Sequence, residues 1–335
     1  MAGWTTWTLA RGLAAAWLVA AAVPAAAAAG PSPAPAADPS PAAVEGTVAV
    51  PGGSLHYTMR GRGEPVLVLS GGPGFAGDYM APVAAELSSS NRTVLLDQRG
   101  TGGSRLDRLD ESTLTVELAV ADLERLRQAL GLDSWIVLGH SWGGMLGMLY
   151  ATAHPAAVSA LVLVASGGPT REFFEPFGDN LEARLLPADR EAVEFWRDPA
   201  RQQADPWRAT YEGLRAKVPA YFFERKKAWL FVAAMRPEGY SSAVNRLLLA
   251  NLERTGYDLR PALRRMHVPA LLLQGRQDPM PESVAIELHG LIEGSQLRFL
   301  DRCGHFAWLE QAEAFYGAVR GFLSGVATPP APGRR

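Results

Sequence analysis

The segment Trp135–Gly144 constrains this chain of 335 residues more than any other segment. A short apolar run, typical of a buried strand, leads directly into Gly139-His-Ser-Trp-Gly143, and an apolar helix-forming segment follows at once. The pattern Gly-x-Ser-x-Gly alone is common by chance in a chain with 34 glycines. Between a strand and a helix, however, it is typical of a nucleophile elbow, with Ser141 exposed at the turn. We expect both glycines to be required, because a Cβ at either position would clash with the neighbouring backbone.

A serine hydroxyl needs a base that removes its proton and a third group that orients the base. After a nucleophile elbow these partners follow in the order acid, then histidine, each behind a late strand. Asp278 follows an apolar run that ends at Leu273, and His305 follows the last strand-like run, 296–300. The sequence therefore predicts a catalytic triad of Ser141, Asp278 and His305.

Alternatives exist for the acid and for the base. Asp278 could instead cap a helix that begins near Pro281. Asp301 is a rival acid, but it lies so close to His305 in sequence that it has little room to reach back. The other five histidines are weaker candidates for the base, because they are expected in a hairpin, in the elbow, at a helix end and at surface or interface positions: His56, His140, His154, His267 and His289.

The tetrahedral intermediate of acyl transfer carries a negative oxygen, which requires an oxyanion hole. One donor is expected to be the backbone N–H of Trp142, directly after the nucleophile. The second is expected from the loop Ser70–Gly74, where Gly72 is the favoured donor. The alternative for this loop is an ordinary Gly-Pro turn.

Apolar runs that alternate with helical segments predict an α/β fold with a mostly parallel central sheet. The predicted elements are a hairpin (44–50 and 55–59), buried strands (65–69, 93–96, 159–165, 269–273 and 296–300) and a helix (116–130). The alternation stops between about 167 and 264, which predicts a helical cap domain inserted after the sixth strand, above the strand ends where ligands bind. The core would then comprise 44–166 and 265–326, followed by a disordered tail, 327–335.

The first 43 residues are not expected to belong to that fold. Arg11, an apolar run and an alanine-rich tract resemble a signal peptide over 1–29, and 30–43 reads as a Pro/Ala-rich linker. The prediction is an exported protein, periplasmic or secreted, without stable membrane association after leader cleavage. An uncleaved membrane anchor is the alternative.

Composition adds few constraints on partners. A net charge of -2 and 48% hydrophobic residues do not suggest binding to nucleic acid or to an anionic membrane. Cys303 is the only cysteine, so no internal disulfide can form, and a small buried apolar role is favoured over a redox role. No cysteine or histidine cluster has metal-ligand spacing, and no metal site is predicted.

Taken together, these motifs resemble the proline iminopeptidases (prolyl aminopeptidases) of the α/β-hydrolase superfamily. The resemblance covers about 44–166 and 265–325 and rests on Gly71-Gly-Pro-Gly74, Asp97-Gln-Arg-Gly-Thr-Gly-Gly-Ser104, Gly139-His-Ser-Trp-Gly-Gly144, Gly275-Arg-Gln-Asp278 and Gly304-His305. It implies the α/β-hydrolase fold, a helical cap, no cofactor, and a serine aminopeptidase that removes an N-terminal residue, usually proline. One departure is Ser70, where the family usually has histidine, so support of the loop is in question.

An aminopeptidase must recognise a protonated α-amine, for which a sheltered carboxylate is the natural partner. The resemblance points to glutamates of the cap, with Glu212 the first candidate and Glu224 and Glu238 as alternatives. Each of them could equally be a solvated charge on a helix face.

The same triad serves an esterase, lactonase or amidase acting on a small non-peptide substrate. An inactive hydrolase scaffold that only binds or signals is a third possibility, which the intact triad residues disfavour. The sequence leaves open the natural substrate, the oligomeric state and whether the leader is cleaved.

Overall fold

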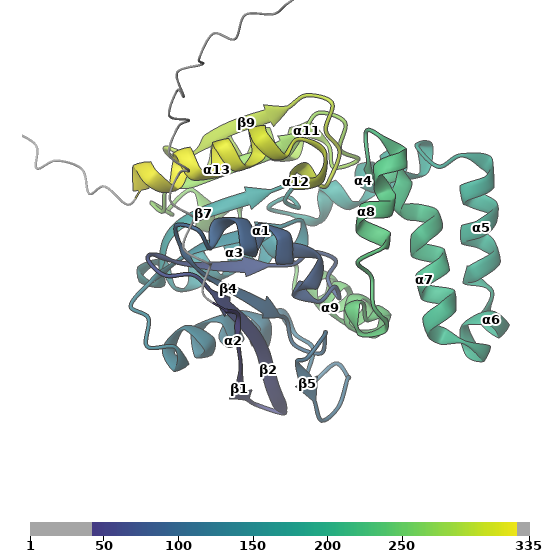
Figure 1. Ribbon diagram of the computed structural model, residues 1–335, viewed down its shortest axis with the longest axis horizontal. Coiled ribbons are helices and arrows are strands. Elements are labelled where there is room, and N and C mark those ends of the chain that lie inside the picture. Colours follow the sequence, from purple (N-terminus) through teal and green to yellow (C-terminus); the bar gives the residue numbers. More distant parts are fainter. Residues whose placement is uncertain (1–41, 327–335) are drawn as a thin grey trace, which may run out of the picture. The chain divides into compact units, whose positions relative to one another are not determined.

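A nine-stranded sheet forms the centre of the computed structural model, which describes residues 42–326 (Figure 1). The strands are β1 (Val44–Val50), β2 (Gly53–Arg60), β3 (Pro65–Leu69), β4 (Arg92–Asp97), β5 (Arg105–Leu106), β6 (Trp135–His140), β7 (Val158–Val164), β8 (Ala270–Gly275) and β9 (Gln296–Leu300). Their order is β1-β2-β4-β3-β6-β7-β8-β9, with β5 paired to β2. Pairings that involve β2 are antiparallel, and all others are parallel. The predicted mostly parallel sheet is confirmed.

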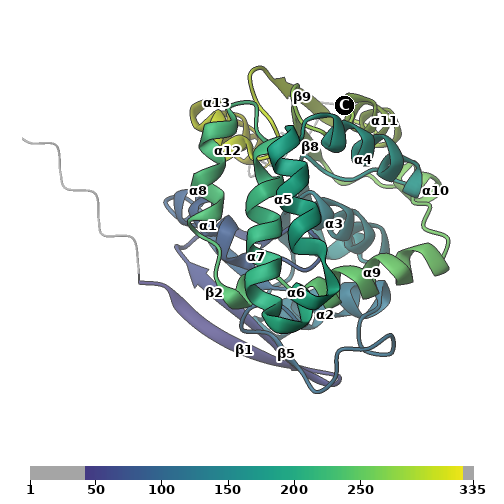
Figure 2. The same ribbon diagram turned by 90° about the vertical axis from the view of Figure 1, so that its right-hand side faces the viewer.

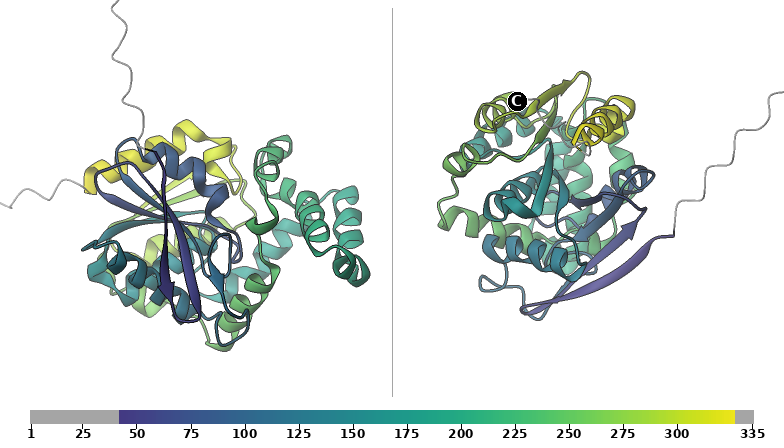
Figure 3. Two further views of the ribbon diagram at one scale, coloured as in Figure 1. Left: turned by 60° about the horizontal axis from the view of Figure 1, so that its bottom comes forward. Right: turned by 90° about the vertical axis from the view of Figure 1, so that its left-hand side faces the viewer.

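Helices cover both faces of the sheet because alternate residues of its central strands point in opposite directions. Leu67 and Leu69 pack into one core with helices α2 (Val116–Ala129), α3 (Trp142–Ala153) and α11 (Glu282–Leu291). Val66 and Val68 pack into the other core with helices α1 (Ala81–Leu87) and α13 (Ala312–Val326). Figure 3 shows the two helical layers on either side of the twisted strands. The loops that follow the central strands therefore project from a scaffold that is packed on both faces.

The chain between β7 and β8 folds into helices and contains none of the sheet's strands (Figure 2). Its α-helices are α4 (Phe174–Ala183), α5 (Pro187–Arg197), α6 (Pro199–Ala204), α7 (Pro206–Lys217), α8 (Ala228–Val232), α9 (Ser242–Arg254) and α10 (Arg260–Leu263). Side chains of Asp205 and Ser241 cap α7 and α9 by accepting hydrogen bonds from backbone amides of their first turns. The insert follows β7, which is the sixth strand if the two-residue β5 is left out. The domain boundaries stay a prediction.

A buried ion pair fixes the loop after β4 to helix α2. The guanidinium of Arg99 donates to both carboxylate oxygens of Asp122, at 2.7 and 2.8 Å, and both side chains are almost fully buried. A further bond joins Arg99 to the carbonyl of Thr113. Such a bidentate pair holds a defined geometry. Arg99 of the Asp-Gln-Arg-Gly segment thus anchors this loop.

Several predictions about the chain ends lie outside the described residues. These are the signal peptide (1–29), residues 30–41 of the linker and the tail (327–335). Among residues 42–326, no helix has the length and apolar character required to cross a bilayer.

Candidate active site

Ser141 lies at a sharp turn between β6 and α3, in the arrangement predicted from the sequence. Its backbone has φ 55° and ψ -118°, a strained conformation for a residue with a side chain. A Cβ on Gly139 would lie 2.2 Å from the carbonyl oxygen of Gly143, and a Cβ on Gly143 would lie 2.6 Å from that of Leu69. The prediction that both glycines are sterically required is confirmed.

Asp278 and His305 form a buried pair on the loops after β8 and β9. Nδ1 of His305 lies 2.9 and 3.0 Å from the two carboxylate oxygens of Asp278. The Asp278 carboxylate also accepts the backbone N–H of Met280 at 2.8 Å. No side chain caps helix α11, so Asp278 does not have the capping role considered as its alternative. The rival Asp301 is 82% exposed and pairs with Arg276 at 2.9 Å.

Ser141 and His305 border the same cavity, which has a volume of about 290 Å³. Parallel strands bring them together because the loops after β6 and β9 leave the same edge of the sheet. Within residues 42–326 their side chains are not hydrogen-bonded to each other. The structure thus brings the three predicted residues to one site, and their joint catalytic role stays a prediction.

Two residues that line the cavity have the backbone amides predicted for the oxyanion hole, and neither amide has a hydrogen-bond acceptor among the described residues. They are Gly72, in the loop after β3, and Trp142, the first residue of α3. Gly72 has φ 116°, a conformation that favours glycine. These are the two amides predicted to form the oxyanion hole. Free donors at the elbow serine have the chemistry such a hole needs.

Gln98 supports the loop that carries Gly72. Its side-chain amide donates to the carbonyl oxygen of Ser70 at 2.7 Å, and its side-chain carbonyl accepts the indole N–H of Trp142 at 2.9 Å. The buried Ser70 hydroxyl donates to the carbonyl of Phe75 at 2.7 Å. Serine in place of the usual family histidine therefore keeps the loop hydrogen-bonded to its surroundings.

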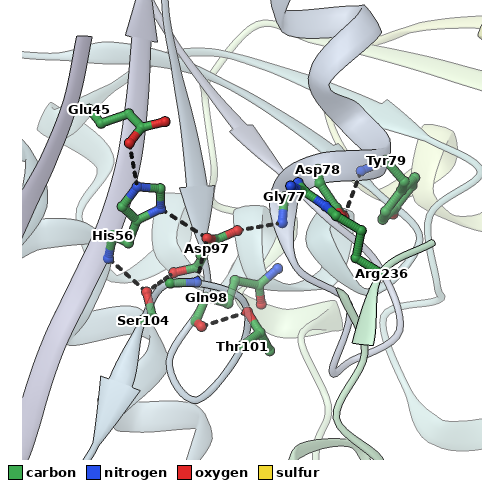
Figure 4. Close-up of polar contacts among 11 residues, drawn as sticks. Glu45, His56, Gly77, Asp78, Tyr79, Asp97, Gln98, Thr101, Ser104 and Arg236 are labelled. Carbon is green, nitrogen blue, oxygen red and sulfur yellow. Dashed lines mark hydrogen bonds and ion pairs between the residues drawn. The ribbon is translucent and has the colours of Figure 1, made fainter. Parts of the chain in front are cut away.

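The carboxylate of Asp97 contacts several of the segments around this loop, as Figure 4 shows. One carboxylate oxygen accepts the amide of Gly77 at 2.7 Å, and the other accepts the amide of Gly103 at 2.8 Å. His56 contacts the second oxygen through Nδ1 at 2.9 Å and faces Glu45 on its other side. Asp97, Gln98 and Arg99 thus each hold a different part of the structure in place.

A buried chain of hydrogen bonds links the loop that carries Gly71 and Gly72 to the loop of His305, the predicted base. The amide of Gly71 donates to the hydroxyl of Tyr79 at 2.5 Å, and this hydroxyl lies 2.8 Å from Nδ1 of His140. Nε2 of His140 lies 3.0 Å from the carbonyl oxygen of His305, which assigns the His140 proton to Nε2. Burial lowers the pKa of His140 well below its usual value, with a smaller contribution from His305. His140 is therefore neutral, and its tautomer is set by its two partners.

The sequence did not predict this chain of hydrogen bonds. His140 was one of several weak histidine candidates, and Tyr79 carried no motif at all. The one available signal was the position of His140 inside the elbow. Tyr79 could not be found because only the fold brings it against the elbow.

Replacing Tyr79 with phenylalanine is expected to lower kcat about 10- to 100-fold, since small displacements of reacting groups are costly. The variant leaves the Gly71 amide and Nδ1 of His140 without their partner, at a cost to folding of about 1–3 kcal/mol for each group. Steady-state kinetics and thermal unfolding measure both effects. Tyr316→Phe, on the half-buried face of α13, is the matched control. Wild-type kcat and stability in Tyr79→Phe would show that this chain of hydrogen bonds has no role in catalysis or folding.

The cap glutamates predicted to bind an amine lie elsewhere. Glu212 pairs with Arg215 at 2.6 Å, and Glu224 pairs with Lys227 at 3.3 Å. Glu238 is exposed and borders a separate polar groove. None of the three is among the residues that line the cavity of Ser141. The residues that the insert contributes to this cavity are largely aromatic: Phe173, Phe174, Phe177, Tyr221, Phe231 and Tyr240.

Cys303 is fully buried, and burial raises the pKa of its thiol. The favoured prediction of a small buried residue is confirmed. A thiol in this environment is a poor nucleophile.

Comparison with known proteins shows the family of this chain. Residues 64–312 match the family described as the alpha/beta hydrolase fold. The chain belongs to this family. A proline iminopeptidase from Xanthomonas citri is 32% identical over 287 residues, covering 78% of this chain and 89% of that protein. A proline iminopeptidase from Heyndrickxia coagulans is 26% identical over 296 residues, covering 84% and 99%. The predicted resemblance to proline iminopeptidases is thereby confirmed.

Solved α/β-hydrolase structures match the fold of this member of the family. A proline iminopeptidase from Mycobacterium smegmatis superposes with a TM-score of 0.64 at 24% identity, covering 84% of this chain and 98% of that one. Est816, an N-acyl homoserine lactone degrading enzyme, superposes with a TM-score of 0.62 at 22% identity, covering 83% and 100%. At these identities the likeness establishes the fold and leaves the substrate open.

Proposed function

We propose that this α/β hydrolase is a serine hydrolase that forms an acyl-enzyme on Ser141. His305 takes the proton of the Ser141 hydroxyl as its oxygen attacks the scissile carbonyl carbon. Asp278 holds the imidazole in the correct tautomer and stabilises its charged form. The observation that carries the proposal is the buried Asp278–His305 pair beside the cavity that holds the elbow serine.

The remaining steps use the free amides and the same base. The N–H groups of Gly72 and Trp142 bind the negative oxygen of the tetrahedral intermediate. His305 then passes its proton to the leaving group, the bond to that group breaks, and the acyl group stays on Ser141. Water attacks the ester, His305 takes a proton from it, and the acid is released with the serine hydroxyl restored.

The first candidate substrate is a peptide with an N-terminal proline, which would make the protein a serine aminopeptidase. The support is the family resemblance and the proline iminopeptidases at 26% and 32% identity. The cavity of about 290 Å³ lies near the lower end of the range for small-molecule sites, about 300–1,000 Å³, which suits a short substrate.

The second candidate is an ester, lactone or amide that lacks a free amine. One observation favours it: no aspartate or glutamate is among the lining residues of the cavity. A buried ammonium on the substrate without a carboxylate partner is costly, so this cavity suits an acyl group that has no free amine.

A substrate panel separates the two candidates. The proteins are the wild type and Glu212→Gln, and the substrates are proline naphthylamide, its N-acetyl derivative and a short acyl ester. An aminopeptidase is expected to hydrolyse the free amine and to reject the acetylated form, with a difference of at least about 100-fold. Glu212→Gln should keep wild-type turnover, because Glu212 pairs with Arg215 outside the cavity.

Hydrolysis of the acyl ester without turnover of either proline amide would contradict the aminopeptidase and favour the second candidate. A protein that hydrolyses none of the substrates and fails to react with a fluorophosphonate would contradict the serine hydrolase itself.

A further inference from the structure

The cavity of Ser141 is lined by a single lysine side chain. Among its lining residues there is no arginine, aspartate or glutamate, and the only lysine is Lys217. Lys217 is the last residue of α7, in the helical insert. The other side chains that the insert contributes are aromatic or apolar, apart from Asn245, whose amide donates to the carbonyl of Pro73 at 2.8 Å. Lys217 is thus the one lysine or arginine among the lining residues of a mostly apolar and aromatic cavity.

The ammonium of Lys217 has no ion pair or hydrogen bond among residues 42–326. Burial lowers its pKa, the positive charge of Arg197 lowers it further, and Glu182 opposes both. The chain has only two other lysines, Lys226 and Lys227, and both pair with a glutamate. Lys217 is therefore the one lysine that combines loss of solvent with the lack of a direct partner.

A partly desolvated ammonium gains a strong, charge-assisted bond when a carboxylate reaches it. The energetic advantage is larger in this cavity than in water, because most of its lining side chains are apolar or aromatic and the local dielectric constant is lower. Lys217 and Ser141 line the same cavity, so a ligand bound there can contact both residues. A carboxylate on the substrate could thus be held while its carbonyl group faces the serine.

We propose that Lys217 is a specificity-determining residue that binds a carboxylate of the substrate. The preferred substrates are then small amides or esters that carry a carboxylate together with an apolar part. This inference rests on the proposed acyl-enzyme at Ser141 and adds the chemical class of its substrate. The carboxylate can belong to the acyl part, as in a half-ester of a dicarboxylic acid, or to the leaving part, as in a dipeptide.

Two matched substrate pairs distinguish these sources. The first pair is the methylumbelliferyl half-ester of adipic acid and the same ester with its free carboxylate converted to a primary amide. The second pair is prolylglycine and prolylglycinamide. Each pair differs only in the charge of one terminal group, so the ratio of the two kcat/KM values reports recognition of that carboxylate. The pair with the higher ratio identifies the part of the substrate that Lys217 contacts.

The proteins compared are the wild type, Lys217→Met, Lys217→Arg and the control Lys226→Met. The wild type is expected to prefer the charged member of one pair by about 10- to 100-fold, as for a hydrogen bond between charged groups. Lys217→Met should lower that ratio to near one, and Lys217→Arg should largely retain it. Lys226, which is 85% exposed and does not line the cavity, should leave the ratio unchanged when replaced.

If Lys217 has a purely structural role at the end of α7, a different result is expected, because lysines also stabilise helix C-termini. In that case Lys217→Met would change thermal stability and leave the charged-to-neutral ratio as in the wild type, which would overturn the proposal. No preference for the carboxylate in either pair by an active wild type would overturn it too. Loss of all activity in Ser141→Ala, with the ratio unaltered in Lys217→Met, would keep the serine hydrolase and reject only the role of Lys217.

Discussion

Replacement of Ser141 with alanine is expected to lower kcat about 10⁶-fold, because the attacking oxygen is removed and no neighbouring group replaces it. Residual turnover would come from binding and from the oxyanion donors alone. Alanine keeps the Cβ, so the strained backbone at φ 55° is unchanged and the fold should persist. Steady-state kinetics with any substrate turned over by the wild type measure the loss, and thermal unfolding checks the fold.

A control serine separates the chemistry from general effects of the substitution. Ser112 is exposed in the loop before α2 and bonds only to Asp110. Ser112→Ala should keep wild-type activity and fluorophosphonate labelling, while Ser141→Ala loses both. Labelling of the Ser141→Ala protein at wild-type rate would place the nucleophile elsewhere and reject the proposed mechanism.

Replacement of Asp278 with asparagine is expected to lower kcat about 10⁴-fold while the site keeps its shape. The carboxylate of Asp278 accepts the Nδ1 proton of His305, with contacts of 2.9 and 3.0 Å. An asparagine amide would donate to Nδ1 instead, and the proton would then sit on Nε2, the nitrogen that must accept the serine proton. Loss of kcat with an almost unchanged KM is the expected kinetic signature.

Asp301→Asn is the matched control for this substitution. Asp301 was the rival acid in the sequence, and it pairs with Arg276 in an exposed position. Its replacement should change kcat by less than about twofold, since exposed ion pairs contribute little. A large loss in Asp301→Asn together with wild-type activity in Asp278→Asn would reverse the assignment of the acid.

Most of the fold was predictable because its elements have strong local signals. Continuous apolar runs such as 65–69 and 269–273 mark strands that are covered on both faces, and the structure has strands there. The elbow was predictable for the same reason, since the clash of a Cβ at Gly139 depends only on the local turn. The order of Asp278 and His305 behind late strands followed from the parallel topology.

The substrate side of the site was less predictable. Glu212 had a suggestive sequence context, yet the structure places it in a pair with Arg215, outside the cavity. Lys217 had no motif and lies five residues further along α7, in the lining of the cavity. On a helix, residues five apart point in different directions, and which face meets the cavity depends on how the helix packs.

The sequence by itself determined the strand-turn-helix at Ser141, the two partners expected for it and the Gly72 loop, because these depend on local backbone geometry and strand order. Only the tertiary structure decided the buried chain through Tyr79 and His140, and the charge of the cavity. Both depend on contacts between segments far apart in the chain, and such contacts leave no periodic or local trace in the sequence. For this reason the sequence predicts a nucleophile at Ser141, whereas only the structure points to Lys217 rather than a glutamate as the charged residue of the cavity.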